Sequence, residues 1–314
     1  MSADERIVKA MGGQARLWVA DGDLSAAREL LAEVEARLTR FDPASDLCAL
    51  NADPSDVVVV HPIVGAFVAA AIRAGRRTGG LVDATLGREI VRAGYERHWA
   101  REPLALGAAL GQAPPRRPAS AAPSGGWRKL WVSPGRDVVR RPAGVILDSG
   151  GIGKGLAADL LARRLQGERF VVDVLGDLRV DAGDGPGLEV VVDHPVREAP
   201  AHVFRLRRGA VATSGIHRRL WRDAAGAPAH HLLDPATGRP AWTGVVSATA
   251  VGRDGVEAEA LAKAALLGGP LAGRRVLCEL GGVLVLEDGG VDVVPALAVV
   301  AARARRDRRK ALAR

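Results

Sequence analysis

The chain of 314 residues is poor in cysteine and in aromatic residues, and it contains no long hydrophobic run. Cys48 and Cys278 lie far apart, and neither has a further cysteine at metal-binding spacing. This usage excludes a disulfide framework and is typical of two ordinary thiols in a reducing compartment. The uncharged apolar stretch near the C-terminus, residues 296–302, is far shorter than the ~20 residues that cross a bilayer. No membrane span is therefore expected.

The N-terminal segment also lacks the apolar core of a secretory signal. Asp4, Glu5, Arg6 and Lys9 interrupt it, whereas a signal needs an apolar run. With Met1 taken as the start, export is not expected. Together with the cysteine usage, this predicts a cytoplasmic protein.

Positive charge is concentrated at the C-terminus. The formal net charge is +8, and residues 303–314 hold seven basic residues against one acidic residue, which leaves a nearly neutral body. Such a run is typical of a solvated helix end or a disordered tail. Because no aromatic residues alternate with it to stack on bases, nucleic-acid binding is not expected.

The periodicity of apolar residues predicts an α+β fold. Leu30, Leu31, Val34 and Leu38 recur at helical spacing, and a second helix is predicted over residues 63–76. Strands are predicted at 15–20, 170–174, 189–192, 202–206 and 245–251, and an Ala-rich helix at 256–267. Tight turns separate most of these strands, which favours a mixed fold over a doubly wound parallel sheet. We expect one domain over residues 1–302, with a possible subdomain link at 103–126, where Ala, Pro, Gly and Ser dominate, and a basic tail at 303–314.

A glycine-rich turn follows a short apolar run at residues 145–147. It reads Asp148-Ser149-Gly150-Gly151-Ile152-Gly153-Lys154-Gly155 and leads into a predicted helix. Glycines let a backbone approach a ligand, the start of a helix attracts an anion, and Lys154 adds a cation for a phosphate oxygen. The spacing fits neither the dinucleotide fingerprint nor the P-loop. Taken alone, the turn is as consistent with a plain tight turn as with a phosphate site.

Several further segments, together with this turn, resemble the FAD:protein FMN transferase (ApbE-like) family and occur in its order. They are Met11-Gly12, Phe41-Asp42-Pro43-Ala44-Ser45 through Leu50-Asn51, Thr78-Gly79-Gly80-Leu81-Val82-Asp83-Ala84-Thr85, the turn at 148–155, Val211-Ala212-Thr213-Ser214-Gly215, and His231-Leu232-Leu233-Asp234-Pro235-Ala236-Thr237-Gly238. The last two and the turn are the most specific. With the Ala-rich helix, they span residues 11–268.

The resemblance implies an ApbE-like fold of mixed, largely antiparallel sheets with flanking helices and a cleft for FAD. The implied enzyme moves FMN from FAD to a Ser or Thr hydroxyl of an acceptor flavoprotein and releases AMP. The implied partners are thus FAD and that acceptor, and Mg²⁺ would bridge the phosphates. This is phosphoryl transfer, in which positioning and charge neutralisation supply most of the acceleration.

The resemblance also implies roles for individual residues. His231 would be the catalytic base and a cofactor contact. The implied cofactor-binding residues are Met11, Phe41, Leu81, Val82, Asp83, Asp148, Lys154, Thr213, Ser214 and His231. Structural alternatives remain: Asp148 as a helix N-cap, His231 as a partner for the backbone of a turn, and Thr213 and Ser214 as turn caps.

The implied metal site departs from the family pattern. Its ligands would be the Gly151 carbonyl and an Asp and a Thr four residues apart in Ala-Asp-Ala-Leu-Ala-Thr-Ala. This chain has Glu259 and Lys263 at those two positions. An ammonium is no metal ligand, and at ~4 Å and an effective dielectric constant of ~20 it repels each unit of positive charge by about 4 kcal/mol. Glu259 and Lys263 also have the i,i+4 spacing of a helical ion pair.

Three hypotheses follow from these two substitutions. Lys263 swings away and Glu259 holds Mg²⁺ with the substrate phosphates, or the ammonium of Lys263 occupies the metal position and neutralises the diphosphate. In the third, the chain is a catalytically weak or inactive FAD-binding homologue that acts as a flavin carrier or regulatory module. Leu175-Gly176-Asp177 and His217 also depart from the family pattern.

Overall fold

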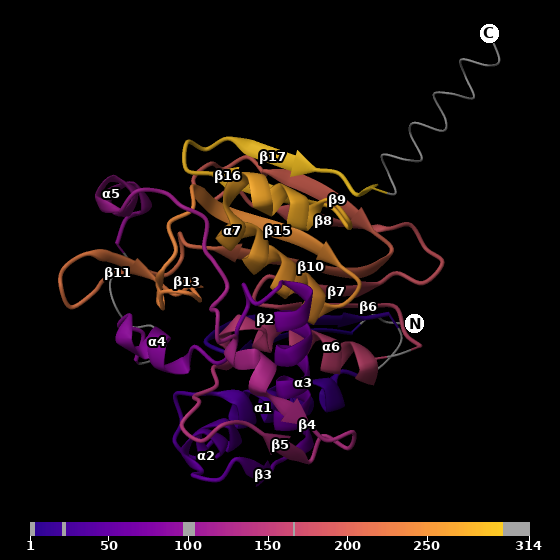
Figure 1. Cartoon of the computed structure of the whole chain (residues 1–314). Coiled ribbons are helices and arrows are strands. Elements are labelled where there is room, and N and C mark those ends of the chain that lie inside the picture. Colours follow the sequence, from indigo (N-terminus) through magenta and orange to yellow (C-terminus); the bar gives the residue numbers. More distant parts are fainter. Residues whose placement is uncertain (1–3, 21–22, 97–103, 166, 298–314) are drawn as a thin grey trace, which may run out of the picture.

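A single antiparallel sheet organises the chain. The computed structural model describes residues 4–20, 23–96, 104–165 and 167–297, and within them an eight-stranded sheet has the order β1-β2-β6-β7-β10-β15-β16-β17 (Figure 1). Each neighbouring pair in it is antiparallel. The strands are β1 (Asp4–Ala10), β2 (Gly13–Val19), β6 (Phe170–Val174), β7 (Asp177–Asp181), β10 (Arg208–Gly215), β15 (Val245–Gly252), β16 (Gly282–Leu286) and β17 (Val291–Val294).

Alternating burial sets the faces of the sheet. In β6, Phe170, Val172 and Val174 are buried and the residues between them are half-buried, as expected for a strand with one face on the core. Val19 is paired with Phe170, so the N-terminal hairpin is tied to the middle of the chain. The sheet therefore joins segments that lie far apart in the sequence.

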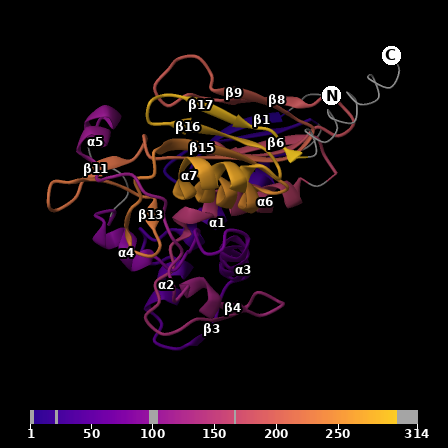
Figure 2. The same cartoon turned by 45° about the horizontal axis from the view of Figure 1, so that its top comes forward.

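Two helices, α6 (Gly153–Arg164) and α7 (Gly255–Leu277), cover one face of the sheet (Figure 2). Ala258 of α7 packs on Ala210 and Ala212 of β10, and these small side chains let the helix lie close to the strand. The helices α6 and α7 meet where a Cβ on Gly155 would lie 2.4 Å from the carbonyl oxygen of Gly255. Glycine is therefore needed there for helix contact.

A further helical layer packs beneath α6 (Figure 2). It contains α1 (Ser25–Leu38), α2 (Asp46–Ala52) and α3 (Pro62–Arg77). Leu31, Val34 and Phe67 are fully buried in its core, and burial of side chains of this size stabilises a fold by about 1.5–3 kcal/mol each. The other face of the sheet carries the hairpin β8 (Leu188–Val192) and β9 (His202–Leu206), whose Val190 and Leu206 pack on Val211.

The remaining elements are short and lie mostly around one end of the large sheet or below the helices. They are β3 (Val57–Val59), α4 (Gly87–Arg92), α5 (Leu106–Gln112), η1 (Gly126–Lys129), β4 (Trp131–Val132), β5 (Val138–Arg140), η2 (Ser149–Gly151), β11 (Leu220–Arg222), β12 (Pro228–His230), β13 (Leu233–Asp234) and β14 (Arg239–Pro240). None of the helices in the described part of the chain has both the length and the apolarity to cross a membrane.

The architecture confirms the predicted α+β class, with differences in detail. The helix predicted at 256–267 continues to Leu277, after a break at Gly269, which has φ of 72° and precedes Pro270. Strand β1 was not predicted, because three charged residues in a row precede Ile7 and Val8, so the segment lacks the alternation of a half-buried strand. The described part of the possible link, 104–126, contains α5 and packs on the body, since Ala119 donates its N–H to the carbonyl oxygen of Leu267. The basic tail at 303–314 lies outside the described residues, and the single-domain prediction stays a prediction.

Candidate active site

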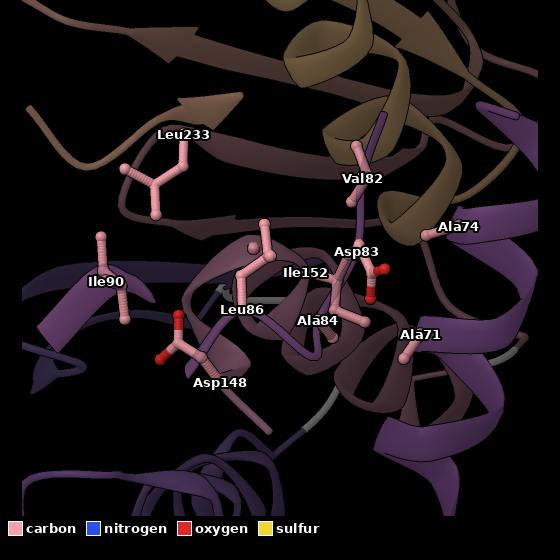
Figure 3. A pocket seen from close by; sticks show the side chains of 11 residues that line it. Ala71, Ala74, Val82, Asp83, Ala84, Leu86, Ile90, Asp148, Ile152 and Leu233 are labelled. Carbon is pink, nitrogen blue, oxygen red and sulfur yellow. The ribbon is translucent and has the colours of Figure 1, made fainter. Parts of the chain in front are cut away.

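A cavity of about 140 Å³ opens beside the glycine turn. Its wall includes five of the residues predicted to bind the cofactor: Met11, Phe41, Asp148, Lys154 and His231. A second, smaller cavity of about 60 Å³ shares Asp148 and Ile90 with it. Figure 3 shows this smaller space, with Asp148 near Leu86 and Ile90 and with Asp83 and Val82 on another part of the wall. The fold thus brings together residues from several predicted motifs.

The glycine turn has an open side and a packed side. No atom lies within 4 Å of the position that a Cβ on Gly151 would take, and Gly151 lines the smaller cavity. Gly155, by contrast, contacts α7, which corrects the expectation that it serves the approach of a ligand.

Asp148 makes no side-chain capping bond to η2 and instead forms an ion pair with Arg40, with 3.0 Å between Oδ1 and Nε. Burial raises the pKa of Asp148, and the charge of Arg40 opposes this shift.

Lys154, in the first turn of α6, is held by a buried carboxylate. Its Nζ lies 2.9 Å from Oδ2 of Asp177, which is 1% exposed. Burial alone would lower the pKa of Lys154, but the carboxylates of Asp177 and Glu259 outweigh it and the pKa is raised. Burial raises the pKa of Asp177 to about 6, against the effect of Lys154. Lys154 is therefore a permanent cation in the cavity wall at neutral pH.

Glu259 and Lys263 form a buried ion pair rather than an exposed one. Nζ of Lys263 lies 2.8 Å from Oε1 of Glu259, and the N–H of Gly155 donates to Oε2 over 2.8 Å. Glu259 is 1% exposed and Lys263 8%. Both oxygens of the carboxylate are thus engaged by groups of the chain itself.

His231 follows β12 and presents a neutral ring to the larger cavity. Burial, and then the charges of Arg219 and other nearby cations, lower the pKa of His231 well below its usual value. Its Nδ1 is buried and has no hydrogen-bond partner among the described residues. An unprotonated imidazole with a free nitrogen can accept a proton from a ligand at neutral pH.

Comparison with known proteins decides the family. The sequence model of the ApbE family matches residues 11–286. The chain belongs to the ApbE family. It is 29% identical over 272 residues to the FAD:protein FMN transferase of Treponema pallidum, covering 81% of this chain and 73% of that protein. It is 27% identical over 292 residues to the FAD:protein FMN transferase of Klebsiella pneumoniae, covering 87% of this chain and 81% of that protein.

Solved ApbE structures share the fold. The ApbE protein of Thermotoga maritima superposes with a TM-score of 0.76 at 25% sequence identity, over 93% of this chain and 97% of that chain. The apo form of the flavinyl transferase ApbE from Pseudomonas stutzeri gives a TM-score of 0.74 at 21% identity, over 95% and 96% of the two chains. The ApbE-like fold expected from the motifs is thereby confirmed.

The metal ligands implied by the ApbE resemblance do not fit a divalent ion in this structure. Both oxygens of Glu259 are taken, by Lys263 and by the Gly155 amide. Mg²⁺ needs near-ideal octahedral oxygen ligands, whereas position 263 offers an ammonium, 2.8 Å from the carboxylate of Glu259, which cannot coordinate a metal ion. The described residues contain no cluster of three His, Cys, Asp or Glu side chains able to hold a metal ion.

Three other residues predicted to bind the cofactor lie outside the walls of the two cavities. Leu81 packs against the core around α7. Thr213 shares a hydrogen bond of 2.8 Å with Thr249 across β10 and β15, while Ser214 is buried on the same strand. Asp83 does line the smaller cavity, but its Oδ1 accepts from the amide and the hydroxyl of Thr85. Their roles in cofactor binding stay predictions.

Among the residues of the larger cavity's wall to which the motifs did not point are Arg40, Tyr95 and Arg219. The guanidinium of Arg40 lies 4.8 Å from the ring centroid of Tyr95, and that of Arg219 lies 5.8 Å from it. Such stacking is favourable and orders long side chains. The single tyrosine of an aromatic-poor chain was a usable signal, whereas Arg219 was one arginine among many.

Proposed function

We propose that this ApbE-family chain transfers FMN from FAD to a Ser or Thr hydroxyl of an acceptor flavoprotein and releases AMP. The observation that carries the proposal is the placement of a cation, Lys154, and a neutral histidine, His231, in the wall of one cavity beside the glycine turn. A diphosphate needs the first, and a hydroxyl nucleophile needs the second. The relatives named FAD:protein FMN transferase support the same chemistry.

In the proposed reaction, the diphosphate of FAD lies beside Lys154 and the start of α6. The hydroxyl of the acceptor gives its proton to the neutral imidazole of His231 as its oxygen attacks the flavin-side phosphorus. The bond from that phosphorus to the bridging oxygen breaks, and AMP leaves with this oxygen and its electron pair. Mg²⁺, which the family resemblance implies, would neutralise phosphate charge when bound. In this structure Glu259 is already paired with Lys263.

The cofactor contacts inside the cavities extend this proposal. We place the phosphates near Lys154 and the ring systems against the apolar parts of the walls, among them Met11, Phe41 and Val82. Contacts of FAD with Leu81, Thr213 and Ser214 would require a ligand that extends beyond the two cavities. The cytoplasmic location stays a prediction from the sequence.

Transfer is tested by incubating the purified protein with FAD and an acceptor flavoprotein. We expect flavin fluorescence that stays on the acceptor after denaturation, together with one AMP for each label. His231→Asn is expected to lower the rate by about 10²-fold or more while FAD affinity stays within about twofold. A transfer rate in His231→Asn equal to that of the parent would contradict the role of His231 as a base.

The buried pair of Glu259 and Lys263 favours a second candidate, a catalytically weak or inactive FAD-binding homologue that carries flavin or regulates a partner. Tight FAD binding with neither labelled acceptor nor AMP would support this candidate and contradict transfer. Absence of FAD binding would contradict both.

A further inference from the structure

We propose that the ammonium of Lys263 is a built-in cation for the ligand's diphosphate, so that this chain binds FAD without a divalent metal ion. The inference rests on the proposed function, because it takes FAD as the ligand. It assigns to one side chain the charge neutralisation that a bound metal would otherwise supply.

The first argument is how firmly Lys263 is held. Glu259 lies one helical turn before it on α7, and the carboxylate joins the ammonium on one side and the amide of Gly155 on the other. Gly155 directly follows Lys154, so the pair is fixed against the first turn of α6. A buried ammonium with this geometry does not swing away without leaving a buried carboxylate unpaired, which is costly.

The second argument is the position of the charge. Lys263 acts electrostatically on Asp148 and His231, where it favours the ionised carboxylate and the neutral imidazole, and on Asp177. Asp148 and His231 both line the larger cavity. Geometry agrees, because the partner of Lys263, Glu259, accepts from the amide of Gly155, the residue after Lys154 in the wall that we assign to the diphosphate.

The third argument is the balance of charge around the turn. Lys154 and Lys263 oppose Asp177 and Glu259, so that the formal charges of these four groups sum to zero. With a neutral residue at position 263 the same set would sum to −1 and would attract a cation. With Lys263 present, a metal ion at ~4 Å and an effective dielectric constant of ~20 would be repelled by about 4 kcal/mol for each unit of its charge.

The first test measures FAD and ADP binding to the whole protein by calorimetry, once with EDTA and once with excess MgCl₂. We expect dissociation constants that agree within about twofold, because the neutralising charge is covalently present. Binding that requires Mg²⁺ would overturn the inference and leave the proposed function standing. No FAD binding in either buffer would instead contradict the proposed function.

Variants at position 263 separate charge from structure. Lys263→Met keeps the length of the side chain and is expected to weaken FAD binding in EDTA by about tenfold or more, while riboflavin, which has no phosphate, binds as before. Lys263→Arg keeps the charge and is the matched control, with affinity close to that of the parent. Unchanged FAD affinity in Lys263→Met would overturn the inference.

The double variant Glu259→Asp with Lys263→Thr gives a second, independent readout. It is expected to fold, as checked by its thermal transition, and to bind FAD about tenfold or more tightly with Mg²⁺ than with EDTA. Lys263→Met supplies the decision if the double variant does not fold. A folded double variant whose FAD affinity in EDTA equals that of the parent would count against Lys263 as the neutralising cation.

Discussion

At the scale of single residues, the site is a set of charges removed from water. Asp177 and Glu259 are almost fully buried, and each holds one lysine at hydrogen-bonding distance. Breaking a buried pair costs more than forming it gains, because the remaining charge stays buried. This predisposes Lys154 to remain in the cavity wall in the absence of a ligand, ordered before any phosphate arrives.

Substitution of Lys154 tests its role as a phosphate contact. Lys154→Met is expected to weaken both FAD and ADP binding by about tenfold or more, since a charge-assisted hydrogen bond to phosphate is lost. Riboflavin affinity serves as the internal control, because this ligand lacks the diphosphate. Equal losses for riboflavin and FAD in calorimetric titrations would show that the change is structural instead.

At the scale of elements, two tight turns meet beside the larger cavity. Met11 and Gly12 join β1 to β2, Leu175 and Gly176 join β6 to β7, and all four have positive φ. A Cβ on Gly13 would lie 2.7 Å from Cδ2 of Leu175. The side chains that positions 13 and 175 can carry are therefore sterically coupled.

A double-mutant cycle measures this coupling. Gly13→Thr alone is expected to destabilise the protein by about 1–3 kcal/mol through overpacking against Leu175. In a Leu175→Gly background the same change is expected to cost less, since the side chain that it meets is gone. Urea unfolding of the four proteins gives the interaction energy, and additive effects would contradict the coupling.

The contact of α6 with α7 gives a second prediction at this scale. Gly155→Ala is expected to lower the free energy of unfolding by about 1–3 kcal/mol, because the new Cβ meets the backbone of α7. Gly151→Ala is the matched control: its Cβ enters open space, so stability should change by less than about 0.5 kcal/mol. FAD affinity should fall in Gly151→Ala, since the methyl group narrows the smaller cavity. The same stability loss in both variants would refute this distinction.

At the scale of the whole molecule, the sequence predicted the order and class of elements better than it predicted their contacts. Strand β6 and helix α3 carry strong periodicity and were located closely. Strand β1 was missed because it lies at the edge of the sheet and is rich in charge, with Asp4, Glu5 and Arg6 in a row. The motif predicts Thr213 at the ligand, which stays a prediction, whereas its hydrogen bond with Thr249 across the sheet could not be read from the motif.

Within the site, the sequence predicted which residues lie close together only where those residues belong to the family motifs. Asp148, Lys154 and His231 share a cavity as their motifs suggested. The burial of Glu259 and Lys263 could not be read from i,i+4 spacing, which is the same on an exposed helix face. The partnership of Lys154 with Asp177 depends on the pairing of β6 with β7, and Arg219 enters the wall through tertiary packing alone.

The free energy of unfolding of the whole molecule depends on pH, and His230 contributes to its loss in acid. This side chain is fully buried, and burial lowers its pKa from 6.5 to about 3. The unfolded state therefore binds a proton that the folded state excludes, and stability is lost as the pH falls below about 6.5. The raised pKa of Asp177 acts in the opposite direction below that pH, so a matched variant is needed to isolate the histidine.

In the parent, the N–H of Leu232 donates to Nδ1 of His230. His230→Asn keeps an acceptor for this N–H but removes the group that takes up a proton as the pH falls. Between about pH 7 and about pH 5.5, the loss of unfolding free energy in this variant should be smaller than in the parent by about 1 kcal/mol. Urea denaturation at the two pH values measures the difference. Identical losses would mean that His230 is protonated in the folded state.

The larger cavity takes its wall from segments spread between Met11 and His231. A partly unfolded chain that releases any one of these segments has no intact binding surface, so a ligand favours only the complete native state. FAD at about 100 times its dissociation constant should then raise the free energy of unfolding by about 2.7 kcal/mol, and the melting temperature should rise in one cooperative transition. Calorimetric heating with increasing FAD would thus measure affinity and folding cooperativity together, because FAD dissociates only when the whole fold unfolds.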